Sequence, residues 1–69
     1  MNEFETLGYL ISLYETLGDD HRSFMERSID AFEWGEVRDG KRLLLKADIC
    51  MLRRIAIADM ILDLYDLKL

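Results

Sequence analysis

The chain has 69 residues, of which 51% are hydrophobic and 33% charged, with a formal net charge of −5 at pH 7. This length allows one domain, and a monomer would bury only about 60% of its unfolded surface, so such chains usually need disulfides, a metal or a partner subunit. Cys50 is the single cysteine, which excludes an intrachain disulfide and fits a reducing cytoplasm. We therefore expect a cytoplasmic protein that oligomerises.

Charge and hydropathy argue against three further classes. Phosphate backbones repel an acidic surface, which argues against general nucleic-acid binding. The N-terminal segment is acidic and lacks the basic start of a secretory signal. Asp59, Asp63 and Asp66 interrupt the apolar C-terminal third, so no membrane span is expected. The absence of proline favours long helices.

The first predicted helix covers about residues 3–17. Asn2 is a candidate N-cap, because its side chain can accept a hydrogen bond from the first turn. Apolar residues recur every three or four positions and form one stripe, which contains Phe4, Leu7, Leu10, Ile11, Tyr14 and Leu17. Gly18 is expected to end this helix as a left-handed cap.

The second predicted helix covers about residues 20–38 and begins at Asp19 or Asp20, antiparallel to the first. Its inner face contains Phe24, Met25, Ser28, Ile29, Phe32 and Gly35. Trp34 points away from the centre of that face. It either packs against the third helix, the commoner fate of a tryptophan, or is an exposed anchor. Asp39–Gly40 predicts a turn, with a kink in one long helix over residues 36–41 as the alternative.

The third predicted helix covers about residues 41–67 and is apolar on two faces. One stripe contains Leu44, Ala47, Met51, Ile55, Ala58, Leu62, Tyr65 and Leu69. The other contains Ile49, Ala56, Ile57, Met60, Leu64 and Leu67. One stripe closes the protomer, and the other is left for a second copy or another protein, because a soluble monomer rarely exposes so large a patch. The preferred contact is the second stripe together with Trp34, although the sequence leaves open which stripe is intramolecular.

These elements predict an all-α fold of three helices, in which a short antiparallel hairpin packs on a long C-terminal helix. A homodimer built as a helical bundle is the expected assembly.

Four aspartates accompany the two stripes and predict an acidic surface: Asp48, Asp59, Asp63 and Asp66. A solvated boundary between the stripes is the ordinary explanation, and a groove for a basic partner or a divalent metal is the alternative. His21 and Cys50 are too few to hold a structural zinc. No metal, cofactor or catalytic residue is predicted.

Two short resemblances involve few residues. The pairs Glu33-x-x-Glu36 and Asp63-x-x-Asp66 loosely resemble the ExxE and ExxD motifs of the helical nucleotide pyrophosphohydrolases of the MazG type, which implies Mg²⁺-dependent hydrolysis. The second pair begins with Asp where that family has Glu. The size of the chain and the string ADIC at residues 47–50 look similar to small plasmid RNA-binding helical-hairpin dimers, and no expectation is based on them.

The surplus apolar stripe, the acidic charge and the lack of a catalytic motif predict a protein-binding regulator, inhibitor or adaptor with no catalysis of its own. Its expected partners are a second copy and another, unidentified protein. The first alternative is a nucleic-acid-binding regulator that uses a local basic patch of Arg38, Lys41, Arg42 and Lys46. The second is the hydrolase that the carboxylate pairs imply.

Overall fold

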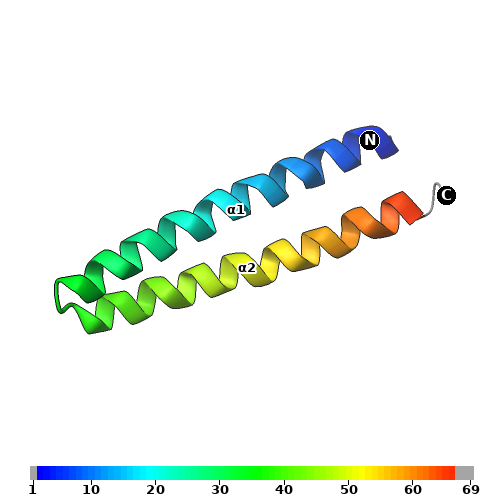
Figure 1. Ribbon diagram of the computed structural model, residues 1–69. Helices are drawn as coiled ribbons and strands as arrows, with labels where there is room; N and C mark the ends of the chain where they lie inside the picture. Colours follow the sequence, from blue (N-terminus) through cyan, green and yellow to red (C-terminus); the bar gives the residue numbers. More distant parts are fainter. Residues whose placement is uncertain (1, 67–69) are drawn as a thin grey trace.

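The computed structural model describes residues 2–66, apart from the side chains of residues 3, 65 and 66. It contains two long helices, α1 (Glu3–Glu33) and α2 (Val37–Asp66), joined by three residues. The helices lie side by side and antiparallel, so one end of the hairpin is the connecting loop and the other holds the start of α1 and the end of α2 (Figure 1). The hairpin measures 51 × 15 × 15 Å. The all-α prediction is confirmed, whereas the prediction of three helices is wrong.

Asn2 begins α1 as predicted. Its Oδ1 accepts a 2.8 Å hydrogen bond from the backbone N–H of Glu5, which satisfies one of the free donors of the first turn. The Asn2 carbonyl also accepts a bond from the Thr6 hydroxyl.

The predicted end of a helix at Gly18 is wrong, because α1 continues through Gly18, Asp19 and Asp20 without a break. Gly18 serves the packing of the two helices instead. A Cβ at this position would come within 2.7 Å of the guanidinium of Arg54 on α2. The glycine therefore makes room for a large side chain from the other helix, which is a use that does not require a left-handed backbone.

The real turn lies at Trp34, Gly35 and Glu36, upstream of the predicted Asp39–Gly40 turn. Gly35 has φ of +77°, the left-handed conformation that glycine adopts without strain. The N–H of Glu36 bonds to the Ala31 carbonyl and the N–H of Gly35 to the Phe32 carbonyl. These two bonds form a Schellman motif, which satisfies the last carbonyls of α1 and reverses the chain.

Asp39 and Gly40 lie inside the first turn and a half of α2, so neither the predicted turn nor the kinked single helix is correct. Gly40 is buried, and a Cβ there would come within 2.8 Å of the Phe32 ring. Like Gly18, it permits a close approach between the helices.

The two helices pack together through residues that recur at alternating spacings of three and four along each helix, which is a heptad pattern. Every side chain in this pattern is buried or half-buried, and we call the set the seam. On α1 the seam contains Leu7, Leu10, Tyr14, Leu17, His21, Phe24, Ser28 and Ala31. On α2 it contains Gly40, Leu43, Ala47, Cys50, Arg54, Ile57, Ile61 and Leu64.

The seam makes only a thin core. The buried hydrophobic residues in the described part of the chain are Leu10, Ala31, Ala47 and Cys50, and three of these four have small side chains. A two-helix hairpin cannot enclose large side chains, because each helix has only one neighbour.

Candidate functional site

Three polar side chains cross the seam and bond to backbone carbonyls of the opposite helix. Ser28 Oγ donates to the Gly40 carbonyl at 2.8 Å, and His21 Nδ1 lies 3.0 Å from the Ala47 carbonyl oxygen. Arg54 Nε donates to the Tyr14 carbonyl at 3.1 Å. Successive bonds are seven residues apart on both helices, so they recur once per heptad and hold the helices in one register.

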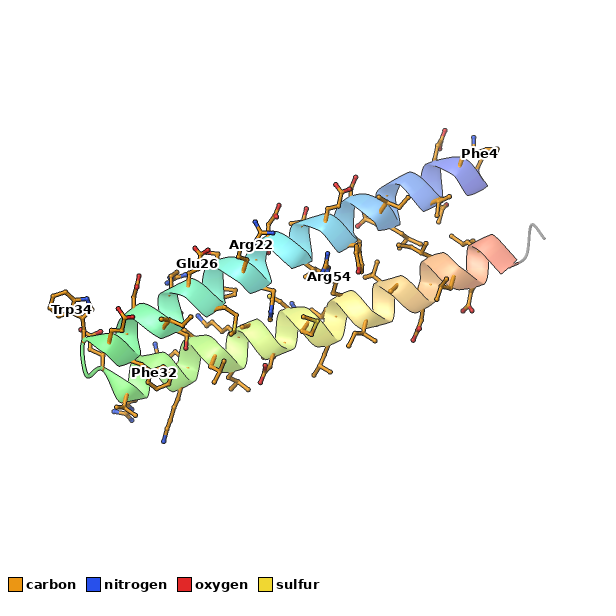
Figure 2. All side chains as sticks on the ribbon, viewed as in Figure 1. Phe4, Arg22, Glu26, Phe32, Trp34 and Arg54 are labelled. Carbon is orange, nitrogen blue, oxygen red and sulfur yellow. The ribbon has the colours of Figure 1, made fainter. Side chains whose placement is uncertain are left out.

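Arg54 also makes a cation–π contact, because its guanidinium carbon lies 3.9 Å from the centre of the Tyr14 ring. Figure 2 shows the Arg54 side chain between the two helices. Sequence analysis did not identify this residue as important. The signal that would have found it is its seam position, where a charge requires a partner.

His21 and Cys50, the single histidine and the single cysteine of the chain, both belong to the seam. One ring nitrogen of His21 bonds to Ala47, and Cys50 is a buried free thiol. His21 lies in the middle of α1 instead of in the first turn of a second helix. Both residues therefore contribute to helix packing.

The two predicted carboxylate pairs lie at opposite ends of the hairpin. Glu33 is the last residue of α1 and Glu36 lies in the loop, whereas Asp63 and Asp66 belong to the last turns of α2. Asp63 follows Glu36 by 27 positions, which corresponds to about 40 Å along a helix. The pairs do not face one another within one chain, and no cluster of three metal-ligating residues exists among the described residues.

The predicted acidic surface is exposed at Asp48, Asp59 and Asp63, while the side chain of Asp66 lies outside the described residues. The separation of Asp48 and Asp59 by 11 residues amounts to about 16 Å along α2. These three carboxylates form a dispersed acidic surface.

A shallow groove of about 400 Å³ lies beside the loop on one side of the hairpin. It is lined by Arg27, Asp30, Ala31, Trp34, Glu36, Asp39, Arg42, Leu43 and Lys46. Two members of the predicted basic patch, Arg42 and Lys46, therefore share this surface with three acids. The alternating signs weaken attraction for a phosphate backbone.

The groove also shows which residues share each side of the hairpin. Arg27 immediately precedes Ser28 on α1, and Trp34 lies just past the end of that helix. Asp39 and Lys46 each immediately precede a seam residue on α2. All four line one groove. The residues that immediately precede Ser28, Gly40 and Ala47 in the sequence therefore lie on the same side of the hairpin, which is the side of the groove. Those that immediately follow Leu10, Ala31, Leu43 and Cys50 must lie on the opposite side.

That opposite side is apolar on both helices, and we call it the broad face. Three of its side chains (Met25, Met51 and Ala58) are half-buried and the other six are exposed. The broad face consists of Ile11, Met25, Ile29 and Phe32 on α1 and Leu44, Met51, Ile55, Ala58 and Leu62 on α2. It combines parts of the predicted inner face of residues 20–38 with most of the first predicted stripe.

A second apolar surface runs along the outside of α2, and we call it the outer stripe. It contains Leu45, Ile49, Leu52, Ala56 and Met60, all exposed. Ile49, Ala56 and Met60 belong to the predicted partner contact. Two other predicted contact residues, Ile57 and Leu64, are half-buried in the seam instead, and Leu67 lies outside the described residues.

Trp34 is the most exposed large hydrophobic residue among those described, at 83%. It caps the C-terminus of α1 and projects from the loop end of the hairpin (Figure 2). The expected packing of Trp34 against a third helix is therefore wrong, and the exposed alternative agrees with its position.

No protein-family model, no curated protein and no solved structure matches this chain. Neither described helix is long and apolar enough to cross a membrane.

Proposed function

We propose that this chain is a small acidic protein-binding regulator, inhibitor or adaptor, which acts in the cytoplasm as a homodimer without catalysis of its own. One observation carries the proposal. Fourteen large hydrophobic side chains are exposed in the described part of the chain, whereas four hydrophobic residues are buried there. Exposed apolar surface on this scale is typical of a site that other proteins cover.

The outer stripe is the surface we assign to a different protein. Its apolar residues follow one another at helical spacing, so they suit the apolar face of an amphipathic helix. Asp59 and Asp63 continue the surface toward the end of α2, and the net charge of the chain is −5. The complementary partner therefore has apolar side chains at its centre and basic residues at its rim.

The proposal is tested by affinity capture from the native host with three matched baits: the natural chain, Leu52→Glu and Ser12→Glu. Leu52 lies on the outer stripe and Ser12 is exposed on α1, so both variants place the same new charge on a solvent-exposed helix. A partner should be retained by the natural chain and by Ser12→Glu and lost by Leu52→Glu.

Calorimetry with the purified partner then measures the effect of the change. Leu52→Glu should weaken binding at least about 10-fold, as expected when a charge enters an apolar contact. Equal affinities for the three baits would contradict the assignment of the outer stripe.

The nucleic-acid alternative predicts a different result. If Arg38, Lys41, Arg42 and Lys46 neutralise phosphates, the affinity for RNA or DNA falls steeply as the salt concentration rises. We expect no measurable binding of either nucleic acid at about 150 mM salt, because Asp30, Glu36 and Asp39 interleave with the basic residues. Tight binding of RNA or DNA that weakens as the salt concentration rises would instead support the nucleic-acid alternative.

A further inference from the structure

We infer that the broad face is the surface on which a second copy of this chain packs, so that two hairpins form a four-helix bundle. This inference deepens the proposed function, because it separates the surface for self-association from the outer stripe.

The width of the apolar surface on each helix is the first argument. A helix with one neighbour needs two apolar positions in every seven, whereas a helix in a bundle needs about three. The seam already supplies two positions per heptad on each helix. The broad face adds a third apolar position per heptad on both helices. Because these positions lie on one side of the hairpin, each helix can pack there against a second neighbouring helix.

The two sides of the hairpin differ in charge, which identifies the side that is covered. The positions next to the seam on the broad face are Ile11, Gly18, Met25 and Phe32 on α1 and Leu44, Met51 and Ala58 on α2, none of which is charged. The corresponding positions on the groove side are Thr6, Leu13, Asp20 and Arg27 on α1 and Asp39, Lys46, Arg53 and Met60 on α2, and five of these eight residues are charged. Burying the groove side would remove these charges from water at high cost, so the broad face is the favourable contact.

The surface area of the chain matches what a dimer needs. A compact monomer of 8.1 kDa is expected to expose about 4,500 Å². This chain exposes 5412 Å², which is about 900 Å² more. A standard protein–protein interface covers about 800 Å² on each partner. One contact with a second copy would therefore bury an area about equal to the area by which the hairpin exceeds a compact monomer of the same mass.

A second copy fits better than an unrelated helix because both helices contribute along the length of the hairpin. The broad face extends from Ile11 to Phe32 on α1 and from Leu44 to Leu62 on α2, about 30 Å along the hairpin, and a second copy supplies an apolar surface of the same length and width. The heptad position of Ile29 and Ile55 carries exposed charges of both signs elsewhere along the hairpin, and these form the rim of the face: Glu15 and Arg22 on α1, and Lys41 and Asp48 on α2. A two-fold contact uses the same surface on both copies and closes at two chains.

The test is sedimentation equilibrium of the full chain and of two matched variants, Ile55→Glu and Leu52→Glu. Both residues are large, aliphatic and on α2, and they are 52% and 66% exposed. They differ in that Ile55 lies on the broad face and Leu52 on the outer stripe. The natural chain and Leu52→Glu should sediment at twice the 8.1 kDa chain mass. Ile55→Glu should raise the dimer dissociation constant at least about 100-fold, because the new charge would be buried in the contact.

Ile55→Glu can also unfold, since the lone hairpin has a thin core. Unfolding of Ile55→Glu with a folded, dimeric Leu52→Glu supports the same assignment. A measurement on the natural chain provides an independent check: its thermal midpoint should rise over a 100-fold increase in concentration, because folding is coupled to association.

Three results would overturn the inference: a folded monomer with a concentration-independent midpoint, an assembly larger than two chains, or loss of the dimer in Leu52→Glu but not in Ile55→Glu. The capture experiment fails independently of this one. If the chain is a monomer that still binds a partner through Leu52, only the dimer inference is contradicted. If the chain is a dimer that captures no partner, only the proposed binding of another protein is contradicted.

Discussion

The aromatic ring of Phe32 on α1 lies directly against Gly40 on α2, so close that a Cβ at position 40 would come within 2.8 Å of the ring. Ser28 Oγ, one turn before Phe32, donates a hydrogen bond to the carbonyl of the same glycine. Ser28 is only 2% exposed. Gly40 is therefore enclosed by α1, and the closeness of the two helices explains why this helical position has no side chain.

Gly40→Ala should destabilise the protein by about 1 kcal/mol. Alanine favours a helix over glycine by about 1 kcal/mol, but the new methyl group displaces the Phe32 ring, and overpacking of this kind costs about 1–3 kcal/mol. The measurement is urea denaturation followed by helical circular dichroism at a fixed protein concentration.

Gly8→Ala is the matched control for Gly40→Ala. Gly8 is also inside a helix, but nothing lies within 4 Å of a Cβ built there. This variant should gain up to about 1 kcal/mol from helix propensity alone. Stabilisation of both variants by the same amount would show that Phe32 moves away from Gly40 without cost.

Ala47→Leu should destabilise the protein by about 1–3 kcal/mol, because Ala47 is 0% exposed in the seam and a larger side chain would force the helices apart. The same substitution at Ala56, which is exposed on the outer stripe, should change the free energy of unfolding by less than about 0.5 kcal/mol. A comparable loss in both variants would argue against the seam as assigned.

Arg54→Lys should destabilise the protein by about 1–2 kcal/mol despite the retained charge. Lysine has no planar group to stack on Tyr14, and it lacks the Nε donor that bonds to the Tyr14 carbonyl. The neighbouring Arg53→Lys is the control, because Arg53 is exposed and its replacement should alter the thermal midpoint by no more than a degree or so. Equal midpoints for the two variants would refute a structural role for Arg54.

Gly35→Ala should cost about 1–2 kcal/mol, because an L-residue is strained at the φ of +77° that the loop requires. Gly35→Asn should lose less, since asparagine visits this conformation more readily than alanine. Both variants replace Gly35 with a residue that has a side chain, so the difference between their thermal midpoints measures the backbone strain. Equal midpoints for the alanine and asparagine variants would show that the left-handed backbone at position 35 does not affect stability.

Local signals identified the helices but not their number. The apolar periodicity, the absence of proline and the Asn2 cap predicted helical structure at almost every described residue. The two long helices confirm it, and the Glu5 N–H donates to Asn2 Oδ1 at the start of the first. Gly18 and Gly40 were misinterpreted as breaks. A glycine that ends a helix and a glycine that admits a neighbouring side chain look alike until that neighbour is known.

One sequence feature would have prevented the error. The heptad pattern of the seam runs from Leu7 to Ala31 and from Gly40 to Leu64 without a change of phase. A helix break at Gly18 would have shifted that phase, because a new helix rarely starts in register with the last one. The loop at Gly35 is where the pattern stops.

The predicted contact residues show the limit of reasoning from one helix at a time. Ile49, Ala56 and Met60 are exposed, but Ile57 and Leu64, assigned to the same stripe, belong to the seam. The broad face was missed because it comprises residues of both helices, which only the antiparallel pairing brings to one side.

Periodicity, composition and capping residues were sufficient for the helical class and for the surplus of apolar surface, because these depend on side chains within about one turn of each other. The position of the turn, the roles of Gly18, Gly40 and Arg54, and the separation of the broad face from the outer stripe depended on packing. The contacts that decide most of these features join residues far apart in the sequence: Ser28 and Gly40 are 12 positions apart, and Tyr14 and Arg54 are 40. Such contacts are selected by the register of two helices as a whole, and no local segment contains that information.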